Sequence, residues 1–127
     1  MANESLLKEL IRYVLPQEIV GYFELIALQE REGTLHLCLE EFNEIPEEYK
    51  GEQLFSNGFY EESTIKDFPL RDRKVVLHIR RRRWVDAEGK SYSRQWELVA
   101  QGTRYSKEFA YFLKEAFGYL PDSGAIS

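Results

Sequence analysis

The chain has 127 residues, of which 43% are hydrophobic and 14% aromatic, and this composition predicts one folded domain with its own core rather than a disordered chain. Its single cysteine excludes an internal disulfide framework and a multi-cysteine zinc site. No apolar run approaches the roughly 20 residues of a membrane-spanning helix and no secretory signal is visible, so we expect a cytoplasmic protein with no membrane partner.

The net charge of −5 is unevenly distributed along the sequence. Residues 1–65 carry 14 acidic and 4 basic side chains, whereas residues 66–127 carry 8 acidic and 13 basic ones. Such asymmetry is typical of a protein with one face for a polyanion and an acidic, solvated opposite face. The two halves can equally attract one another, and the sequence leaves both interpretations open.

The first predicted element is a helix over residues 4–15, which Asn3 can cap and Pro16 can end. Apolar residues recur there at helical spacing and form one stripe. The stripe consists of Leu6, Leu7, Leu10, Ile11, Val14 and Leu15.

A β-hairpin follows, with strands over residues 22–30 and 34–42 and Gly33 at the tight position of the turn. Alternation places two sets of side chains on opposite faces of the second strand. One set is Leu35, Leu37 and Leu39, and the other is His36, Cys38 and Glu40.

Residues 43–63 have the composition of a loop, with Pro46, Gly51 and the turn pair Asn57–Gly58. In residues 64–74, Pro69 limits any strand to a sheet edge or a bend.

Residues 74–84 and 91–101 predict a second hairpin, in which Gly89 takes the left-handed position of the turn and Asp86 faces Lys90. This register would place Trp84 opposite Tyr92. It would also place Arg82 opposite Arg94, and Arg80 opposite Trp96.

Ser106 is a suitable N-cap for a final helix over residues 107–117, and a tail over residues 121–127 is expected to be disordered. We therefore expect one domain over residues 1–120. Its fold class is α+β, with antiparallel β-hairpins and a helix near each end.

Four consecutive arginines, Arg80, Arg81, Arg82 and Arg83, stand at the outer half of the predicted second hairpin. The like-charge pair of Arg82 and Arg94 is unfavourable in isolation, and a polyanion would relieve it. Trp84 and Trp96 can brace the guanidiniums through their ring faces, while Lys90 adds charge at the turn. A two-stranded ribbon fits the DNA major groove, and arginine suits phosphates and guanine edges.

Arg104 and Lys107 flank the start of the last predicted helix, where free amide groups favour phosphate, and they can extend the same footprint. The alternative explanation of the arginines is intramolecular pairing with the glutamates of the first half. The segments EEFNEIPEE and YEES supply the nearest candidates.

The stretch TIKDFPLRDRKVVLHIRRRRW resembles a motif in the N-terminal region of DDE-type insertion-sequence transposases, and the resemblance extends over residues 45–113. The flanking cysteine pairs of the zinc-headed members are missing, so the chain is most similar to a cysteine-less subgroup. The resemblance implies a degenerate zinc-ribbon-like arrangement of the hairpins without metal, and zinc is not expected. The matching residues are Asp67, Phe68, Pro69, Leu70, Arg73, Val75, Leu77, Ile79, Arg81, Arg82, Arg83 and Trp84.

The resemblance implies a non-enzymatic module that binds DNA at transposon ends and supports assembly of the transposition complex. Possible further partners are the catalytic transposase subunit and a second copy of the chain, since the catalytic acidic residues are expected elsewhere. The alternative is a protein-interaction, dimerisation or regulatory module without direct DNA contact.

The remaining titratable residues predict no catalysis and no cofactor. The glutamate-rich segments lack metal-ligand spacing, and His36 and His78 are far apart in sequence, so ordinary strand packing is the expectation for both. Cys38 has no nucleophile motif and is expected to be a half-buried thiol.

Overall fold

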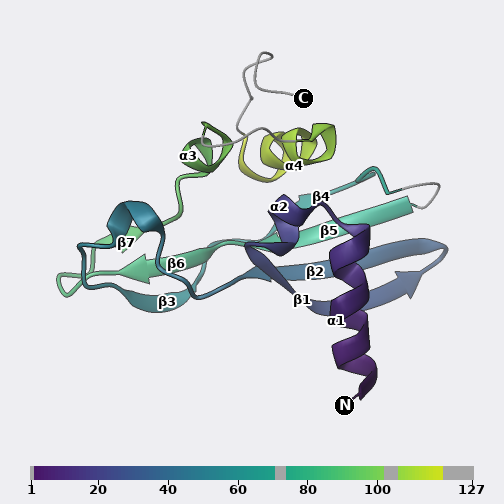
Figure 1. Cartoon of the computed structure of the whole chain (residues 1–127), viewed down its shortest axis with the longest axis horizontal. Coiled ribbons are helices and arrows are strands. Elements are labelled where there is room, and N and C mark those ends of the chain that lie inside the picture. Colours follow the sequence, from purple (N-terminus) through teal and green to yellow (C-terminus); the bar gives the residue numbers. More distant parts are fainter. Residues whose placement is uncertain (1, 71–73, 102–105, 119–127) are drawn as a thin grey trace.

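A computed structural model of the protein describes residues 2–70, 74–101 and 106–118. The prediction of an α+β fold is confirmed, since helices pack on a sheet and a second, smaller sheet extends from it (Figure 1). The helices are α1 (Ala2–Val14), α2 (Gln17–Val20), the 3-10 turn η1 (Glu47–Tyr49), α3 (Trp96–Gln101) and α4 (Lys107–Phe117). The strands are β1 (Phe23–Arg31), β2 (Thr34–Glu41), β3 (Phe55–Phe59), β4 (Ser63–Ile65), β5 (Lys74–Arg80), β6 (Arg82–Val85) and β7 (Ser91–Tyr92).

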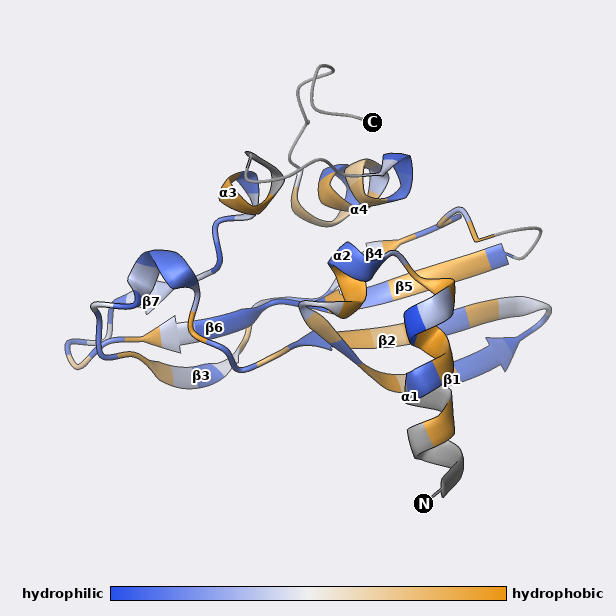
Figure 2. Cartoon of the chain, viewed as in Figure 1, coloured by the Kyte–Doolittle hydropathy of each residue, from blue (hydrophilic) through white to orange (hydrophobic). Residues whose placement is uncertain are grey.

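The main sheet has the strand order β1-β2-β5-β4. Strands β1 and β2 form the predicted hairpin, with Gly33 at φ 81° in its turn, but β2 and β5 are parallel neighbours, which a set of simple antiparallel hairpins would not contain. The predicted leucine face of β2 packs in the core, where Leu37 and Leu39 are buried. Figure 2 shows the hydrophobic residues concentrated along β2, β5 and the helices.

One hydrophobic core lies between the main sheet and all four α-helices of the described chain. Trp96 of α3 stacks on Phe23 of β1 and on Phe117 of α4, with ring centroids 5.5 and 4.7 Å apart. Ser106 caps α4 by accepting a hydrogen bond from the Phe109 amide at 3.1 Å, as its sequence predicts. These contacts bring the C-terminal helices onto the same face as α1 and α2.

The small sheet, β3-β6-β7, has a buried tryptophan of its own outside that core. Trp84 on β6 is fully buried, and its Nε1 donates to Asn43 Oδ1 at 3.0 Å. The Asn57–Gly58 pair, predicted to lie in a loop, instead forms an irregularity within β3, where the register shifts and Gly58 has φ 70°. A glycine there permits the left-handed backbone that the shift requires.

The predicted second hairpin is only partly correct. Its turn and tip are confirmed, since Asp86 and Lys90 are joined through the backbone at 3.0 Å and Trp84 pairs with Tyr92. However, residues 74–84 are divided between β5 of the main sheet and β6 of the small sheet, and residues 96–101 form helix α3 rather than a strand. The second strand ends at Tyr92 because the chain then turns so that Trp96 can enter the main core.

No helix in the described ranges is both long and apolar enough to cross a membrane. The predicted disordered tail over residues 121–127 and the C-terminal limit of the predicted domain at residue 120 lie outside the described residues.

Candidate functional site: the arginine segment

The arginine segment, residues 80–83, carries the chain from β5 in the main sheet to β6 in the small sheet (Figure 1). Its even-numbered members lie over Phe59, the last residue of β3. The guanidinium carbons of Arg80 and Arg82 are 5.6 and 4.6 Å from that ring centroid. Arg80 also pairs with Glu40 at 3.0 Å, and Arg82 Nη1 donates to Ser56 Oγ at 2.8 Å.

The odd-numbered members lie over Tyr60, the residue that follows β3. Arg81 and Arg83 are 5.1 and 5.9 Å from its ring centroid. Arg83 Nε donates to the Asn57 carbonyl at 3.2 Å. Arg81 also lies 5.4 Å from the Phe117 ring, and its buried Nε has no hydrogen-bond partner within the described ranges.

A buried carboxylate joins the two sheets at this point. Glu41, the last residue of β2, is 1% exposed, and its Oε2 accepts a hydrogen bond from Arg94 Nε at 2.7 Å. Its Oε1 accepts from the Arg82 amide, and its carbonyl accepts from Arg82 Nε, both at 3.1 Å. Arg94 is also packed over the Tyr22 ring at 4.7 Å. Both arginines of the predicted like-charge pair therefore share one acidic residue.

Burial raises the pKa of Glu41 above its usual 4.5, and the hydrogen bonds from Arg94 and Arg82 offset only part of this effect. The folded state therefore binds the proton of Glu41 more tightly than the unfolded state does. By linkage, the stability that this difference contributes is fully present below pH 4.5 and is lost as the pH rises through the raised folded-state pKa.

We expect the wild type to lose stability relative to the Glu41→Gln variant as the pH is raised from about 4 to about 7, because glutamine cannot ionise. Urea denaturation of both proteins across this range measures the difference. A difference that stays constant with pH, or that changes in the opposite direction, would contradict the burial effect.

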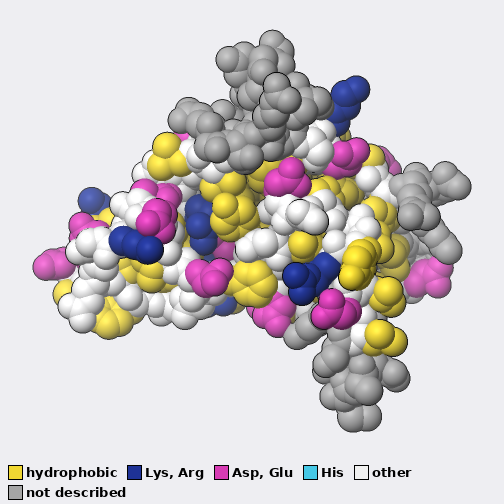
Figure 3. Space-filling model, in the orientation of Figure 1, with side chains coloured by type: hydrophobic (Ala, Val, Ile, Leu, Met, Phe, Trp, Pro, Cys, Tyr) yellow, Lys and Arg dark blue, Asp and Glu magenta, His cyan; other side chains and the backbone are white. Residues whose placement is uncertain are grey.

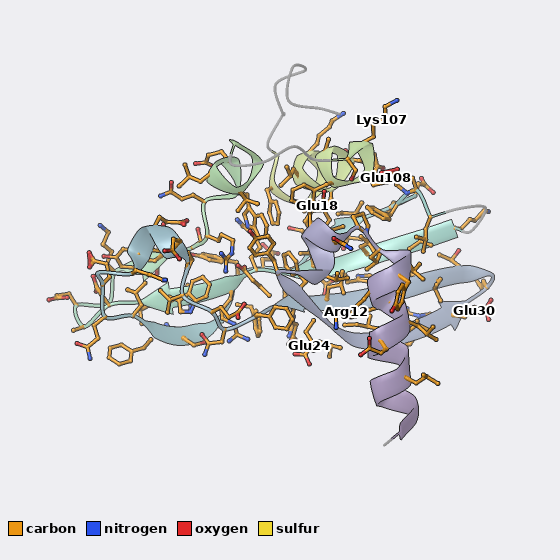
Figure 4. The ribbon with its side chains drawn as sticks, in the orientation of Figure 1. Arg12, Glu18, Glu24, Glu30, Lys107 and Glu108 are labelled. Carbon is orange, nitrogen blue, oxygen red and sulfur yellow. The ribbon has the colours of Figure 1, made fainter. Side chains whose placement is uncertain are left out.

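The other predicted site residues occupy very different environments. Trp84 and Trp96 are 0% and 4% exposed, Trp96 within the main core and Trp84 outside it, so they cannot stack on a ligand in this structure. Lys90 is exposed at the tip of the small sheet. Lys107 is exposed at the start of α4, which is far along the chain from the arginine segment (Figure 4). Arg104 lies outside the described residues.

The partners of the arginine segment are residues to which sequence reasoning assigned no individual role. Glu40 and Glu41 belong to the segment EEFNEIPEE, for which the sequence predicts pairing without naming individual residues. Their ion pairs with Arg80 and Arg94 are the intramolecular pairing that the sequence offers as the alternative to DNA binding. Phe59 and Tyr60 lay in a predicted loop. The available signal was the adjacent aromatic pair itself, because two neighbouring rings can each lie under alternate arginines of a strand.

A second polar cluster lies on the face of the main sheet away from the helices. The parallel pairing of β2 and β5 brings the two histidines together, with His36 Nδ1 2.9 Å from His78 Nε2, while His78 Nδ1 lies 2.8 Å from Glu62 Oε2. Since a carboxylate oxygen only accepts, His78 Nδ1 carries a proton in its contact with Glu62. Sequence reasoning missed the contact between the histidines because they are 42 positions apart.

This cluster does not amount to a recognisable catalytic or metal centre. Desolvation, reinforced by Arg31 and His78, lowers the pKa of His36, and burial is the main cause that raises the pKa of the neighbouring Cys38 thiol. A neutral imidazole and a protonated thiol provide no activated nucleophile. Within the described ranges, no three histidine, cysteine, aspartate or glutamate residues are arranged to hold a metal ion.

Comparisons with known proteins found no matching family model, no similar curated protein and no similar solved structure.

Proposed function

We propose that the chain is a DNA-binding N-terminal module of an insertion-sequence transposase, acting at transposon ends and in assembly of the transposition complex. One observation supports DNA binding most directly. Within the described residues, the guanidiniums of Arg81, Arg82 and Arg83 have no carboxylate partner and are held by rings, carbonyl groups and a hydroxyl. Their positive charge is therefore oriented but not neutralised by direct pairing. The resemblance of residues 45–113 supports the transposase assignment.

The proposed footprint is smaller than the sequence alone suggests. Its members are the partly exposed Arg82 and Arg83, the exposed Lys90, and Arg80, which pairs with Glu40 but keeps its side chain 51% exposed. Arg94 is committed to Glu41. With up to about four phosphate contacts, log K should fall against log salt with a slope of about −3 to −4 on duplex DNA.

The test is a binding titration over a salt series, using duplexes that carry the terminal repeats of the element and scrambled duplexes. The Arg83→Glu/Lys90→Glu variant should lose at least about 100-fold in affinity, because both cations become anions facing phosphate. Arg81 is unsuitable as a probe, since a carboxylate at its buried position would disturb folding.

The matched control is the Arg31→Glu/Lys66→Glu variant, which makes the same charge change at two exposed positions outside the arginine segment. It should retain most of the affinity. Weak binding that is insensitive to salt, or equal losses in the two variants, would contradict a DNA surface at the small sheet.

A second candidate function is protein interaction without DNA contact, which the exposed apolar side chains of α1 favour. Leu6, Leu10 and Tyr13 are 61%, 54% and 83% exposed. Apolar surface of this kind, gathered on one element, is typical of contact with another protein.

A further inference from the structure

Only part of the apolar stripe of helix α1 packs against the rest of the protein. Ile11 and Leu15, near its C-terminal end, are buried in the main core at 9% and 3% exposure. Leu6, Leu10 and Val14, on the adjoining side of the stripe, are 61%, 54% and 44% exposed. Figure 3 shows separate hydrophobic side chains on the described part of this helix. The amphipathic face of α1 therefore has one packed side and one unpacked side.

The position of α1 makes the unpacked side accessible. Its N-terminal half projects beyond the main sheet on the side of β1 (Figure 1). Strand β1 is an edge strand, so no other described strand pairs with its outer side, and it exposes Ile26 and Leu28 at 50% and 37%. A groove of about 790 Å³, lined in part by Phe23 and Leu39, separates α1 from β1 and β2. The helix and the groove offer a protrusion and a recess on one surface.

We propose that a second copy of the chain occupies this surface, with its α1 packed antiparallel against α1 of the first copy around a two-fold axis near Leu10. This inference gives a partner to the second candidate function and is independent of DNA binding. A two-fold contact uses the same patch on both copies, so the patch must be self-complementary. Antiparallel pairing centred on Leu10 places the two Leu10 side chains together and Leu6 of each copy near Val14 of the other.

The described charged residues of α1 leave the proposed contact free of charge. Glu9 and Arg12 are 63% and 67% exposed and 3.9 Å apart at their nearest charged atoms, so their internal pairing is weak. Arg12 is two positions from Leu10 and therefore lies on the other side of the helix from the paired Leu10 side chains. Figure 4 shows Arg12 on the side of α1 toward Glu24 and β1, at the groove that both residues line.

The exposed apolar area reaches the lower limit for a specific dimer. Six apolar side chains on α1 and β1 are between 37% and 83% exposed, which corresponds to on the order of 500 Å² per copy. Burial of the same patch on two copies removes about 1,000 Å² from water, the lower limit for a specific interface. The six residues are Leu6, Leu10, Tyr13, Val14, Ile26 and Leu28.

Sedimentation velocity of the full chain, at concentrations from about 1 to 200 μM, tests the proposal. The wild type should change from monomer to dimer within this range. The Leu6→Glu/Leu10→Glu variant should dimerise at least about 100-fold more weakly, because two carboxylates would be buried in the contact. Leu98→Glu is the matched control, since Leu98 is 42% exposed on α3, and it should dimerise as the wild type does. Circular dichroism checks that each variant is folded.

Cross-linking tests the two-fold axis itself. In a Cys38→Ser background, Leu10→Cys should form a disulfide-linked dimer on mild oxidation, whereas Leu98→Cys should not. A wild type that stays monomeric, a dimer that persists in the Leu6→Glu/Leu10→Glu variant, or no cross-link at Leu10→Cys would overturn the proposal. The Arg83→Glu/Lys90→Glu variant should still dimerise, so loss of DNA binding and loss of self-association can be told apart.

Discussion

Replacement of Glu41 with alanine is expected to lower the free energy of unfolding by about 3–5 kcal/mol, as is usual when one partner of a buried ion pair is removed. The change would leave the Arg94 guanidinium buried without its carboxylate. It would also remove the acceptor of the Arg82 amide. Because these groups join β2 to the small sheet, the loss combines an unpaired charge with an unpaired donor. Urea denaturation at pH 7 measures it.

The neighbouring Glu40 provides the control for this experiment. Glu40 pairs with Arg80 at 3.0 Å, but these side chains are 25% and 51% exposed, so Glu40→Ala should cost only about 0–1 kcal/mol. Similar losses in the two variants would show that Glu41 has no special role at the junction. Glu41→Gln should lose less than Glu41→Ala, since its amide oxygen can still accept one hydrogen bond.

Replacement of Trp84 with alanine is expected to destabilise the small sheet by about 3–5 kcal/mol, as for other fully buried tryptophans. Trp84 lies outside the main core, so the damage should be local. Hydrogen exchange should show amide protection lost in β3 and β6 but retained in β2 and β5. This pattern would establish that the small sheet opens independently.

Phe55 is the matched control for Trp84, because it is an aromatic residue of the same sheet that is 51% exposed. Phe55→Ala should leave the protection of β6 nearly unchanged. If Trp84→Ala reduced protection equally in both sheets, the two sheets would form one cooperative unit, and the local account would be wrong.

The elements that the sequence predicted correctly are those with local determinants. Helix α4 has its Ser106 cap and an apolar stripe at helical spacing, and both signals lie within the element itself. The β1–β2 hairpin likewise has its own turn, with Gly33 in a left-handed conformation. Such signals require no knowledge of distant residues.

The incorrect predictions arose where long-range packing overrides local pattern. The run from β5 into β6 reads as one strand, yet it is divided because its first half pairs with β2 and its second half with β3. Parallel pairing with β2 joins segments about 40 residues apart, and no tight turn in the sequence between them indicates it. Residues 96–101 alternate enough to suggest a strand, but burial of Trp96 against Phe23 favours the helix.

The candidate site was predictable in composition but not in geometry. The arginine segment is conspicuous in the sequence, and pairing with the acidic half was one of two open explanations. Which glutamates approach the arginines depends on the end of β2 lying beside the start of β6, and this proximity is a property of the complete fold. The alternation of arginines over Phe59 and Tyr60 required β3 to be recognised as a strand.

Hydrogen exchange at the arginine Nε–H groups, followed by NMR, tests most directly whether Arg82 and Arg94 join the two sheets through Glu41. The Nε protons of Arg82 and Arg94, which are bonded to the Glu41 carbonyl and carboxylate, should exchange at least about 10-fold more slowly than those of the exposed Arg12 and Arg31. Equally fast exchange at all four groups would contradict the account, because it would mean that these guanidiniums are free in solution.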